Sequence, residues 1–387
     1  MWIKNLKIWD GVSDELSDAD AIEINEGKIV SIDSSDSVRQ RESVDMKGLF
    51  VMPGLIDAHV HMCLNPDLRD PLVQDKPGRE ELLQEMTSRA QDMLRVGITT
   101  ARDLGGGQWL ELELRDRINR GEVIGTRLIC AGQPITSIKG HCYFWGGEAK
   151  DAGEAETVIR RQVEHGVDLM KIMATGGTMT SGTTPADAQF DTDVLTAIVK
   201  AAKKLSLSVA AHCHGTAGIR NASEAGVTTI EHCSWVGDSG WGRNYDEQVM
   251  ALIAEKGIWV SPTINAGWRR HIGSRNFETL VRGNYAKMRQ AGVKLIASTD
   301  AGIPNVRHTD LPRAIPVFAH FAGLTNVEAC RAATSDCAEA IGLGRSVGRI
   351  YPGYEADLVF YENNPLAGLD CLENPARVLA RGRFVDC

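Results

Sequence analysis

The chain has 387 residues, of which 43% are hydrophobic and 24% charged, and its 42 Lys and Arg against 51 Asp and Glu give a net charge of −9. This composition excludes disordered and fibrous proteins, and the length indicates either one large α/β barrel with additions or two to three smaller domains. Because the chain is acidic and has no cluster of basic residues, nucleic acid is not expected as a partner.

Three features of the sequence concern the location of the protein. The longest uncharged stretches fall short of the ~20 apolar residues that a membrane-spanning helix needs. The first residues, Met1–Lys4, lack the basic region and apolar core of a signal peptide. The nine cysteines are an odd number and several lie beside histidines, which favours reduced thiols. We therefore expect a cytoplasmic protein without membrane contact.

The two ends of the chain, residues 1–52 and 346–387, are rich in strand and turn patterns and show no long helical periodicity. We expect them to join as one small β-domain, a β-sandwich, beside a larger domain at residues 53–345. The strands expected in the end segments are Ile22–Ile24 and Ile29–Ile32, joined by a hairpin turn at Asn25–Lys28, and then Gly353–Tyr361 and Ala376–Ala380.

The middle of the chain alternates short apolar runs with helical patterns, which is typical of repeated βα units and a parallel sheet. The helical period is seen, for example, at Leu82, Met86 and Ala90. Eight such units predict an α/β fold, a (β/α)8 TIM barrel. The strands are predicted at Leu55–Val60, Ile98–Ala101, Arg127–Cys130, Leu169–Met173, Ser208–His212, Thr228–His232, Ile258–Ser261 and Lys294–Ser298.

Histidines and charged residues fall at the ends of five of these strands. His59 and His61 end the first strand, and their imidazoles point the same way because side chains alternate along a strand. A single histidine of this kind is more often a core residue than a ligand, but barrel enzymes place their sites at the carboxyl ends of the strands. The further candidates at these ends are Lys171, His212, His232 and Asp300.

Lys171 lies in an otherwise apolar strand, where an ammonium group is costly unless it is neutralised or paired. Reaction with carbon dioxide would convert the amine to a carbamate, an anionic group that can bridge two divalent ions. The alternative is a lysine whose stem is buried and whose charge reaches water at the end of the strand.

In this order and spacing the residues resemble the motifs of the amidohydrolase superfamily of metal-dependent hydrolases, over nearly the whole chain. Within the superfamily the chain is similar to the branch of imidazolonepropionase-like proteins and Xaa-Pro dipeptidases (prolidases). The motifs are Pro53–His61, Lys171, Ala211-His212, Glu231-His232, Ser298–Gly302 and Gly353–Val359. A lysine on strand four argues against imidazolonepropionase activity itself, which resembles a mononuclear system.

The resemblance implies two divalent metal ions, and zinc is the default because the ligands are imidazoles and carboxylates, although manganese, cobalt or iron also suit them. It implies that Lys171, N6-carboxylated, bridges the ions, with His59, His61 and Asp300 on one ion and His212 and His232 on the other.

The mechanism implied by such a site is attack of a hydroxide, formed from a water shared by the two ions, on a carbonyl or phosphoryl group. Asp300 would accept the proton and pass it to the leaving nitrogen. The alternative for Asp300 is a structural aspartate in a turn or helix cap.

Four further residues are candidates for substrate binding. His141 either polarises the scissile carbonyl or packs its loop. His214 stands where the dipeptidases often carry a tyrosine, a departure that weakens a specific dipeptidase assignment, and it either bonds the oxyanion or has no role. Arg269 and Arg270 either pair with a substrate carboxylate or are solvated. The segment Thr175–Gly182 is rich in glycine and threonine and could close over the substrate.

Three functions are consistent with these residues. The first is hydrolysis of a C–N amide bond in a dipeptide such as Xaa-Pro or in an N-acyl amino acid. The second is hydrolysis of a urea, carbamate or xenobiotic amide, in a more apolar pocket. Its lining would be Tyr143, Phe144, Trp145 and Trp268. The third is a non-catalytic scaffold, against which the complete ligand set argues. A homo-oligomer is expected in each case.

Overall fold

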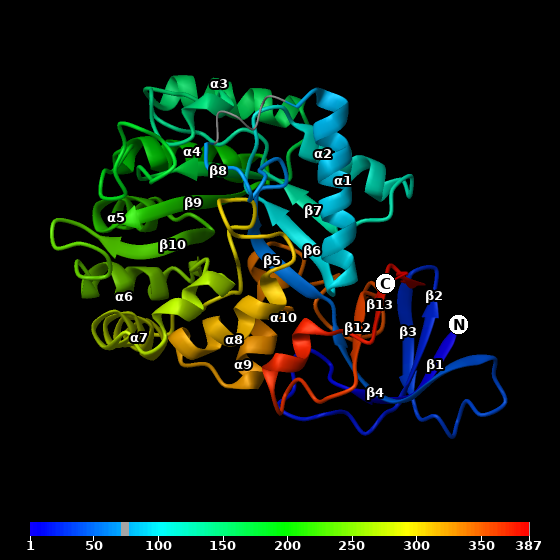
Figure 1. Ribbon diagram of the computed structural model, residues 1–387. Coiled ribbons are helices and arrows are strands. Elements are labelled where there is room, and N and C mark those ends of the chain that lie inside the picture. The colour runs from blue at the N-terminus through cyan, green and yellow to red at the C-terminus, as the bar shows by residue number, and fades with distance from the viewer. Residues whose placement is uncertain (71–76, 387) are drawn as a thin grey trace.

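Parallel strands surrounded by helices form the larger part of the protein, and a small sheet that contains both chain termini lies beside them (Figure 1). The computed structural model describes residues 1–70 and 77–386. The barrel strands fall into two hydrogen-bonded sets, β5-β6-β7 and β8-β9-β10-β11, and all pairs within them are parallel. Their bounds are β5 Leu55–Val60, β6 Ile98–Asp103, β7 Arg127–Cys130, β8 Leu169–Met173, β9 Ser208–Gly215, β10 Thr229–Val236 and β11 Trp259–Ser261.

The predicted eighth strand, Lys294–Ser298, is a chain of single bridges rather than a regular strand. Leu295 bridges β11, and three residues beyond the predicted strand Ala301 bridges β5 at Val60, so this segment connects the two sets. On the other side, Ile135 bridges β8 at Ile172, and its N–H donates to the carbonyl of Lys171 at 2.8 Å. The sheet therefore closes, and the predicted (β/α)8 barrel is confirmed.

The helices cover the outside of the barrel (Figure 1). In α1, Leu82, Met86 and Ala90 are buried, as their period predicts. No helix among the described residues is both long and apolar enough to cross a membrane. The helices are α1 Arg79–Arg95, α2 Leu110–Asn119, α3 Ala152–Glu164, α4 Thr192–Lys204, α5 Thr216–Ala225, α6 Glu247–Glu255, α7 Arg275–Gln290, α8 Leu311–Ala322, α9 Asn326–Ala332 and α10 Ser335–Ala340, with 3-10 turns η2 Tyr143–Trp145, η3 Ala266–His271 and η4 Leu369–Glu373.

Strands from both termini share one seven-stranded sheet of order β14-β13-β12-β4-β1-β2-β3. It has its own apolar cluster, which includes Ile3, Ile22, Leu358 and Phe360. β4 ends at Pro53 and β5 begins at Leu55, with one residue between them, so the sheet is joined closely to the first barrel strand. The bounds are β1 Trp2–Ile8, β2 Ala21–Asn25, β3 Lys28–Asp33, β4 Ser43–Pro53, β12 Leu358–Tyr361, β13 Arg377–Ala380 and β14 Arg383–Phe384.

The cysteines of the described chain are all free thiols, in line with the expectation of reduced cysteines. Cys213 and Cys233, beside the two histidines His212 and His232, are buried in the apolar core. They therefore pack on the side of the strand away from the histidines.

Candidate metal centre and substrate cavity

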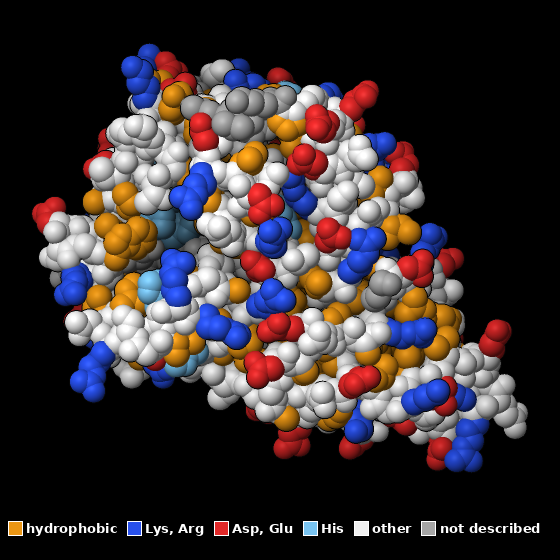
Figure 2. Space-filling model, viewed as in Figure 1, with side chains coloured by type: hydrophobic (Ala, Val, Ile, Leu, Met, Phe, Trp, Pro, Cys, Tyr) orange, Lys and Arg blue, Asp and Glu red, His pale blue; other side chains and the backbone are white. Residues whose placement is uncertain are grey.

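A cavity of about 370 Å³ lies at the carboxyl ends of the barrel strands. Figure 2 shows histidine side chains inside a hollow on the visible face of the molecule. A volume of this size is typical of sites for small molecules. All six residues expected at the metal site line the cavity, namely His59, His61, Lys171, His212, His232 and Asp300.

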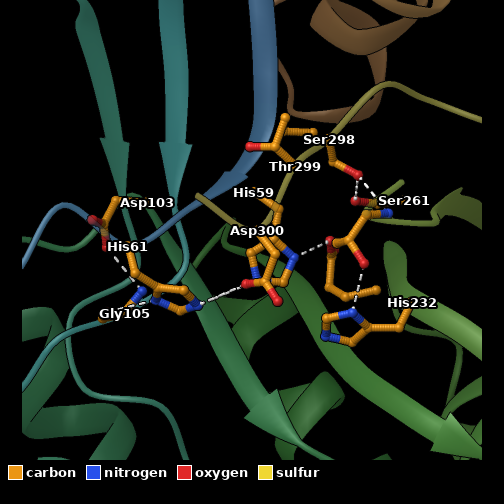
Figure 3. Close-up of polar contacts among 12 residues, drawn as sticks. His59, His61, Asp103, Gly105, His232, Ser261, Ser298, Thr299 and Asp300 are labelled. Atoms are coloured by element: carbon orange, nitrogen blue, oxygen red, sulfur yellow. Dashed lines mark hydrogen bonds and ion pairs between the residues drawn. The ribbon is translucent and has the colours of Figure 1, made fainter. Parts of the chain in front are cut away.

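The first group of donors comes from β5 and the segment that closes the barrel. The Nε2 atom of His59 lies 3.2 Å from Oδ1 of Asp300, and Nε2 of His61 lies 3.5 Å from the same oxygen. The two Nε2 atoms are 3.3 Å apart. Figure 3 shows the three side chains pointing toward one another. Two imidazole nitrogens and a carboxylate oxygen at this spacing suit one divalent cation.

The second group contains three histidines instead of the two expected. Donor atoms of His212, His214 and His232 lie within 4.8 Å of one another. The rings of His214 and His232 stack with centroids 4.3 Å apart, and Nδ1 of His214 is 2.9 Å from the Ser234 hydroxyl. His214 therefore belongs to the same cluster as the two expected ligands, on the wall of the cavity.

The side chain of Lys171, from β8, lines the cavity. Its residue is 1% exposed. None of the described residues forms a hydrogen bond or ion pair with its ammonium group. Burial lowers the pKa of Lys171, although the nearby carboxylates of Glu231 and Asp300 act in the opposite direction. A lowered pKa increases the fraction of neutral amine, which is the form that reacts with carbon dioxide.

The outer partners of the histidines decide which ring nitrogens face the cavity. Nδ1 of His59 lies 3.0 Å from Oε2 of Glu231, and Nδ1 of His61 lies 2.9 Å from the carbonyl oxygen of Gly105. A carbonyl can only accept, so Nδ1 of His61 carries the hydrogen and Nε2 offers a lone pair. Nδ1 of His232 likewise contacts the Thr263 hydroxyl at 2.8 Å.

Glu231 is ionised although it is completely buried. Burial alone would raise the pKa of its carboxyl, but the Arg102 guanidinium and the hydrogen bond from His59 hold the pKa well below its usual range. Arg102 donates to Oε1 of Glu231 at 2.8 Å, and also to the Ala58 carbonyl at 2.7 Å. The carboxylate therefore accepts the Nδ1 hydrogen of His59 and leaves Nε2 free for a metal.

The charge states in the cavity suit metal binding. Burial, assisted by Lys171, lowers the pKa of His59 to about 4. Burial also places the pKa values of His212 and His232 well below the usual range, so all three rings are neutral at pH 7. For Asp300, burial raises the pKa, but His59 and His61 lower it further and the side chain is a carboxylate. Neutral imidazoles and a carboxylate are the forms that bind metal ions.

The backbone of Asp300 is held in an unusual conformation. Its φ is +63°, a left-handed value that few residues other than glycine adopt, and His232 has a φ of +68°. The preceding residue, Thr299, is fixed by Asp57, which accepts from the Thr299 N–H at 3.1 Å and from its hydroxyl at 2.5 Å. Conformations of this kind persist where surrounding contacts impose them, and they are frequent at active sites.

The candidates for substrate binding divide into two groups. His141 and His214 line the cavity. Arg269 and Arg270 do not, because they lie on η3 with exposed side chains away from it. Instead Arg69, on the loop after β5, is the arginine among the described lining residues. Of the two alternatives for Arg269 and Arg270, their exposed positions agree with solvation rather than with a contact to the substrate.

The aromatic residues expected around an apolar pocket also divide. Trp145 lines the cavity, whereas Tyr143, Phe144 and Trp268 do not. Trp268 packs instead on Phe277 and Phe321, outside the cavity. One aromatic side chain of the four therefore faces the substrate space.

The segment Thr175–Gly182 already forms part of the cavity wall, rather than standing off as an open lid. Thr178 and Met179 line the cavity, and Thr175 and Thr180 are buried. The carbonyl of Gly176 lies 3.1 Å from Nε2 of His212. The segment therefore fixes site residues in the structure.

Several residues that shape the site were not singled out from the sequence. Arg102 is a charged residue in the buried strand β6, and the argument from buried charge that singled out Lys171 applies equally to it. Glu231 is part of the Glu231-His232 motif, but only its contact with His59 shows its role. Arg69 and Thr180 lie in loops, and no periodic pattern marks them.

The chain is similar to a known family and to several proteins of known activity. The model of the family described as "Amidohydrolase family" matches residues 50–385. An ochratoxinase of Aspergillus niger is 28% identical over 369 residues, covering 85% of this chain and 73% of that protein. An imidazolonepropionase of Chloroflexus aggregans is 24% identical, covering 88% and 83%. The crystal structure of a Xaa-Pro dipeptidase with bound methionine in its active site superposes with a TM-score of 0.87 at 27% identity, covering 100% of this chain and 99% of that one.

Glu231→Gln is expected to reduce the free energy of unfolding by about 3 to 5 kcal/mol at pH 7, because it leaves the buried charge of Arg102 without its partner. Urea unfolding followed by tryptophan fluorescence measures the effect. The pKa of Glu231 is lowered by folding, so its contribution is present above the unfolded pKa of ~4.3 and is lost as the pH falls below it. The difference between wild type and variant should therefore shrink in acid.

Asp92→Asn is the matched control, since the ion pair of Asp92 with Arg95 is about half exposed. It is expected to change the free energy of unfolding by less than about 1 kcal/mol. Adding Arg102→Met to Glu231→Gln should restore part of the loss. A Glu231→Gln protein as stable as the control variant would contradict the role given to this pair.

Proposed function

The chain belongs to the amidohydrolase family and to its branch of imidazolonepropionases and prolidases, and from this premise we propose that it hydrolyses a small amide with a free carboxylate, a dipeptide or an N-acyl amino acid. Hydrolysis of a C–N bond by an enzyme is supported by the family and by the named hydrolases among its relatives. The observation that carries the finer proposal is the pairing of a complete metal-donor set with an arginine, Arg69, that lines the same cavity and has no partner among the described residues.

The donor set fits two divalent ions. His59, His61 and Asp300 would hold one ion, and His212 and His232 the other, with His214 adjacent. Zinc is the proposed metal, because neutral imidazole and carboxylate are its usual ligands. When bound, such ions lower the pKa of water and polarise a carbonyl group.

Carboxylation of Lys171 is part of the proposal. The amine nitrogen would attack carbon dioxide and lose a proton, which gives a carbamate anion in place of a cation. The site otherwise sets the buried lysine beside histidines that also become positive when protonated, and Lys171 itself contributes to the lowered pKa of His59 and His141. A carbamate would remove this conflict and add an anionic ligand between the two donor groups.

Asp300 and His141 have separate roles in the proposed reaction. Asp300 is ionised, so its carboxylate accepts a proton and passes it to the leaving nitrogen, which must be protonated before the C–N bond breaks. His141 faces the cavity and donates a ring N–H to the carbonyl oxygen, where negative charge develops. Its ring is neutral, because burial and Lys171 lower its pKa to about 4.

Arg69 is the residue proposed to bind the carboxylate of the substrate. It lines the cavity with an exposed side chain, and none of the described residues pairs with its guanidinium. The carboxylate of Asp300 at the base of the cavity repels a second anion, so a substrate carboxylate is favoured at the mouth. A guanidinium binds a carboxylate through two parallel hydrogen bonds, which fixes the orientation of the substrate.

The second candidate is hydrolysis of a urea, carbamate or xenobiotic amide. It is favoured by the apolar part of the wall, formed by Trp145, Met173, Met179 and Ile303. Such a substrate would need no contact with Arg69. Comparison of substrates with and without a carboxylate therefore separates the two candidates.

Removal of metal with a chelator is expected to abolish amide hydrolysis, and zinc, manganese or cobalt should restore it. The purified enzyme should contain about two metal ions per chain, and Lys171→Ala should lower kcat/KM by at least about 100-fold because the bridging ligand is lost. Metal analysis and the density at Lys171 in a crystal structure measure these expectations.

Lys200→Ala, on the outer face of α4, is the control and should behave as wild type. One metal ion per chain with an unmodified Lys171, or a fully active Lys171→Ala enzyme, would rule out the bridged pair of ions.

Arg69→Ala is expected to raise the KM for a dipeptide by about 10- to 100-fold, because a charge-assisted hydrogen bond contributes ~1.5 to 3 kcal/mol. A substrate whose carboxylate is capped as an amide should lose the preference, and Arg69→Lys should keep part of it. Steady-state kinetics on the capped and uncapped pair measure the change.

Arg269→Ala is the matched control, because that arginine lies outside the cavity, and its KM should stay within about two-fold of wild type. If Arg269→Ala raises KM while Arg69→Ala does not, the carboxylate lies on the other side of the cavity mouth and the proposal for Arg69 fails.

A further inference from the structure

The ring of His141 is held in one position on the cavity wall. The residue is 5% exposed, and its ring lies against that of His212 with centroids 4.7 Å apart. Its backbone N–H donates to the side chain of Gln189, and its Nδ1 atom lies 3.1 Å from Oγ1 of Thr180. The ring is therefore fixed by residues of the loop that follows β8.

Glycine at position 177 makes this arrangement sterically possible. A Cβ atom on Gly177 would lie 2.4 Å from Cε1 and 2.5 Å from Nε2 of His141, closer than any side chain can approach. The backbone of Gly177 is held in turn by Thr183, whose hydroxyl lies 3.2 Å from the Gly177 carbonyl. Gly177 and Thr180 therefore lie beside the ring of His141, and Thr183 binds the backbone of both.

Two contacts position Thr180 and leave its hydroxyl hydrogen available for His141. Its Oγ1 accepts from the backbone N–H of Cys142 at 2.9 Å, and its carbonyl accepts from the Thr183 hydroxyl at 3.1 Å. Thr180 is 5% exposed, so the hydroxyl has little access to bulk water. None of the described residues other than His141 offers an acceptor to the hydroxyl hydrogen of Thr180.

The tautomer of His141 follows from these hydrogen bonds of Thr180. An amide N–H can only donate, so the contact with Cys142 uses a lone pair of the Thr180 hydroxyl, and its hydrogen points to Nδ1 of His141. Nδ1 then accepts, and the ring hydrogen sits on Nε2. The opposite tautomer would leave the buried hydroxyl hydrogen of Thr180 without an acceptor, which costs free energy.

We propose that Thr180 is a positioning residue that fixes His141 as the tautomer with hydrogen on Nε2, so that His141 donates to the carbonyl oxygen of the bound amide. The assignment rests on the proposed function, because the oxygen that receives this hydrogen bond belongs to the amide substrate. The lack of a side chain at Gly177 leaves space for the ring in this position, and the Thr180 contact decides which nitrogen carries the hydrogen.

The test compares Thr180→Val, which keeps the shape and removes the hydroxyl, with Thr180→Ser, which keeps the hydroxyl. Thr180→Val is expected to lower kcat by about 10- to 100-fold with KM changed by less than about three-fold, since the donor acts where charge develops. Thr180→Ser should recover most of kcat. Thr157→Val, an exposed threonine on α3, is the control and should match wild type. Equal kcat in Thr180→Val and wild type would overturn the proposal.

A second readout does not depend on activity. In metal-loaded protein labelled with ¹⁵N-histidine, His141, assigned by its absence in His141→Asn, should show a protonated Nε2 in wild type and Thr180→Ser. It should show a mixture of tautomers in Thr180→Val, or in Thr180→Ala if the valine variant does not fold. A tautomer that is the same in all variants would overturn the proposal. If the tautomer shifts but wild type cleaves no amide, the role of Thr180 stands and the proposed function fails.

Discussion

The buried ion pair between Arg102 and Glu231 is the interaction on which the rest of the cavity depends. Both side chains lie inside the barrel, where an unpaired charge is very costly, and each compensates the other at 2.8 Å. Because Arg102 keeps Glu231 ionised, the second oxygen of Glu231 can hold the Nδ1 hydrogen of His59. Nε2 of His59 then faces Asp300 as a lone pair. A charge pair formed by β6 and β10 in this way sets the tautomer of His59, a candidate metal ligand on β5.

The same principle extends to the other rings, and each is controlled by a group outside the cavity. The carbonyl of Gly105 sets His61, the hydroxyl of Thr263 contacts Nδ1 of His232, and the carbonyl of Gly176 binds Nε2 of His212. His212 therefore presents Nδ1 to the cavity, whereas the other three rings present Nε2. The partners are mostly backbone carbonyls and hydroxyls, which stay neutral over the whole pH range. The donor set is thus prepared by the fold, before any ion binds.

The barrel and the donors on its strands were predictable from the sequence, because strand periodicity places His59 and His61 on one side and brings the strand ends together. The eighth strand was less predictable in form, since its residues bond alternately to β11 and β5 and bend around Asp300 at φ +63°. The loops were not predictable. The sequence shows that arginines follow strands, but it does not show that the loop after β5 turns inward at Arg69 while η3 turns outward. The direction of a loop depends on contacts between segments far apart in sequence, which no local pattern carries.

The cavity therefore has two parts with different physical origins. Its base is built from strand residues whose charges are fixed by buried partners, and a change there disturbs the barrel as well as the chemistry. Its walls come from loops, where Arg69 is free of partners among the described residues and Trp145 and Met179 supply apolar surface. Replacement of a wall residue costs little stability, because few buried charges depend on it. A fold of this kind can keep the same hydrolytic residues at the bottom of the cavity, while changes in the walls alter which substrate binds. Thr180 differs from the other loop residues, since it is buried and fixes the ring of His141 on the cavity wall, so the loop after β8 has less freedom to vary than the loop that carries Arg69.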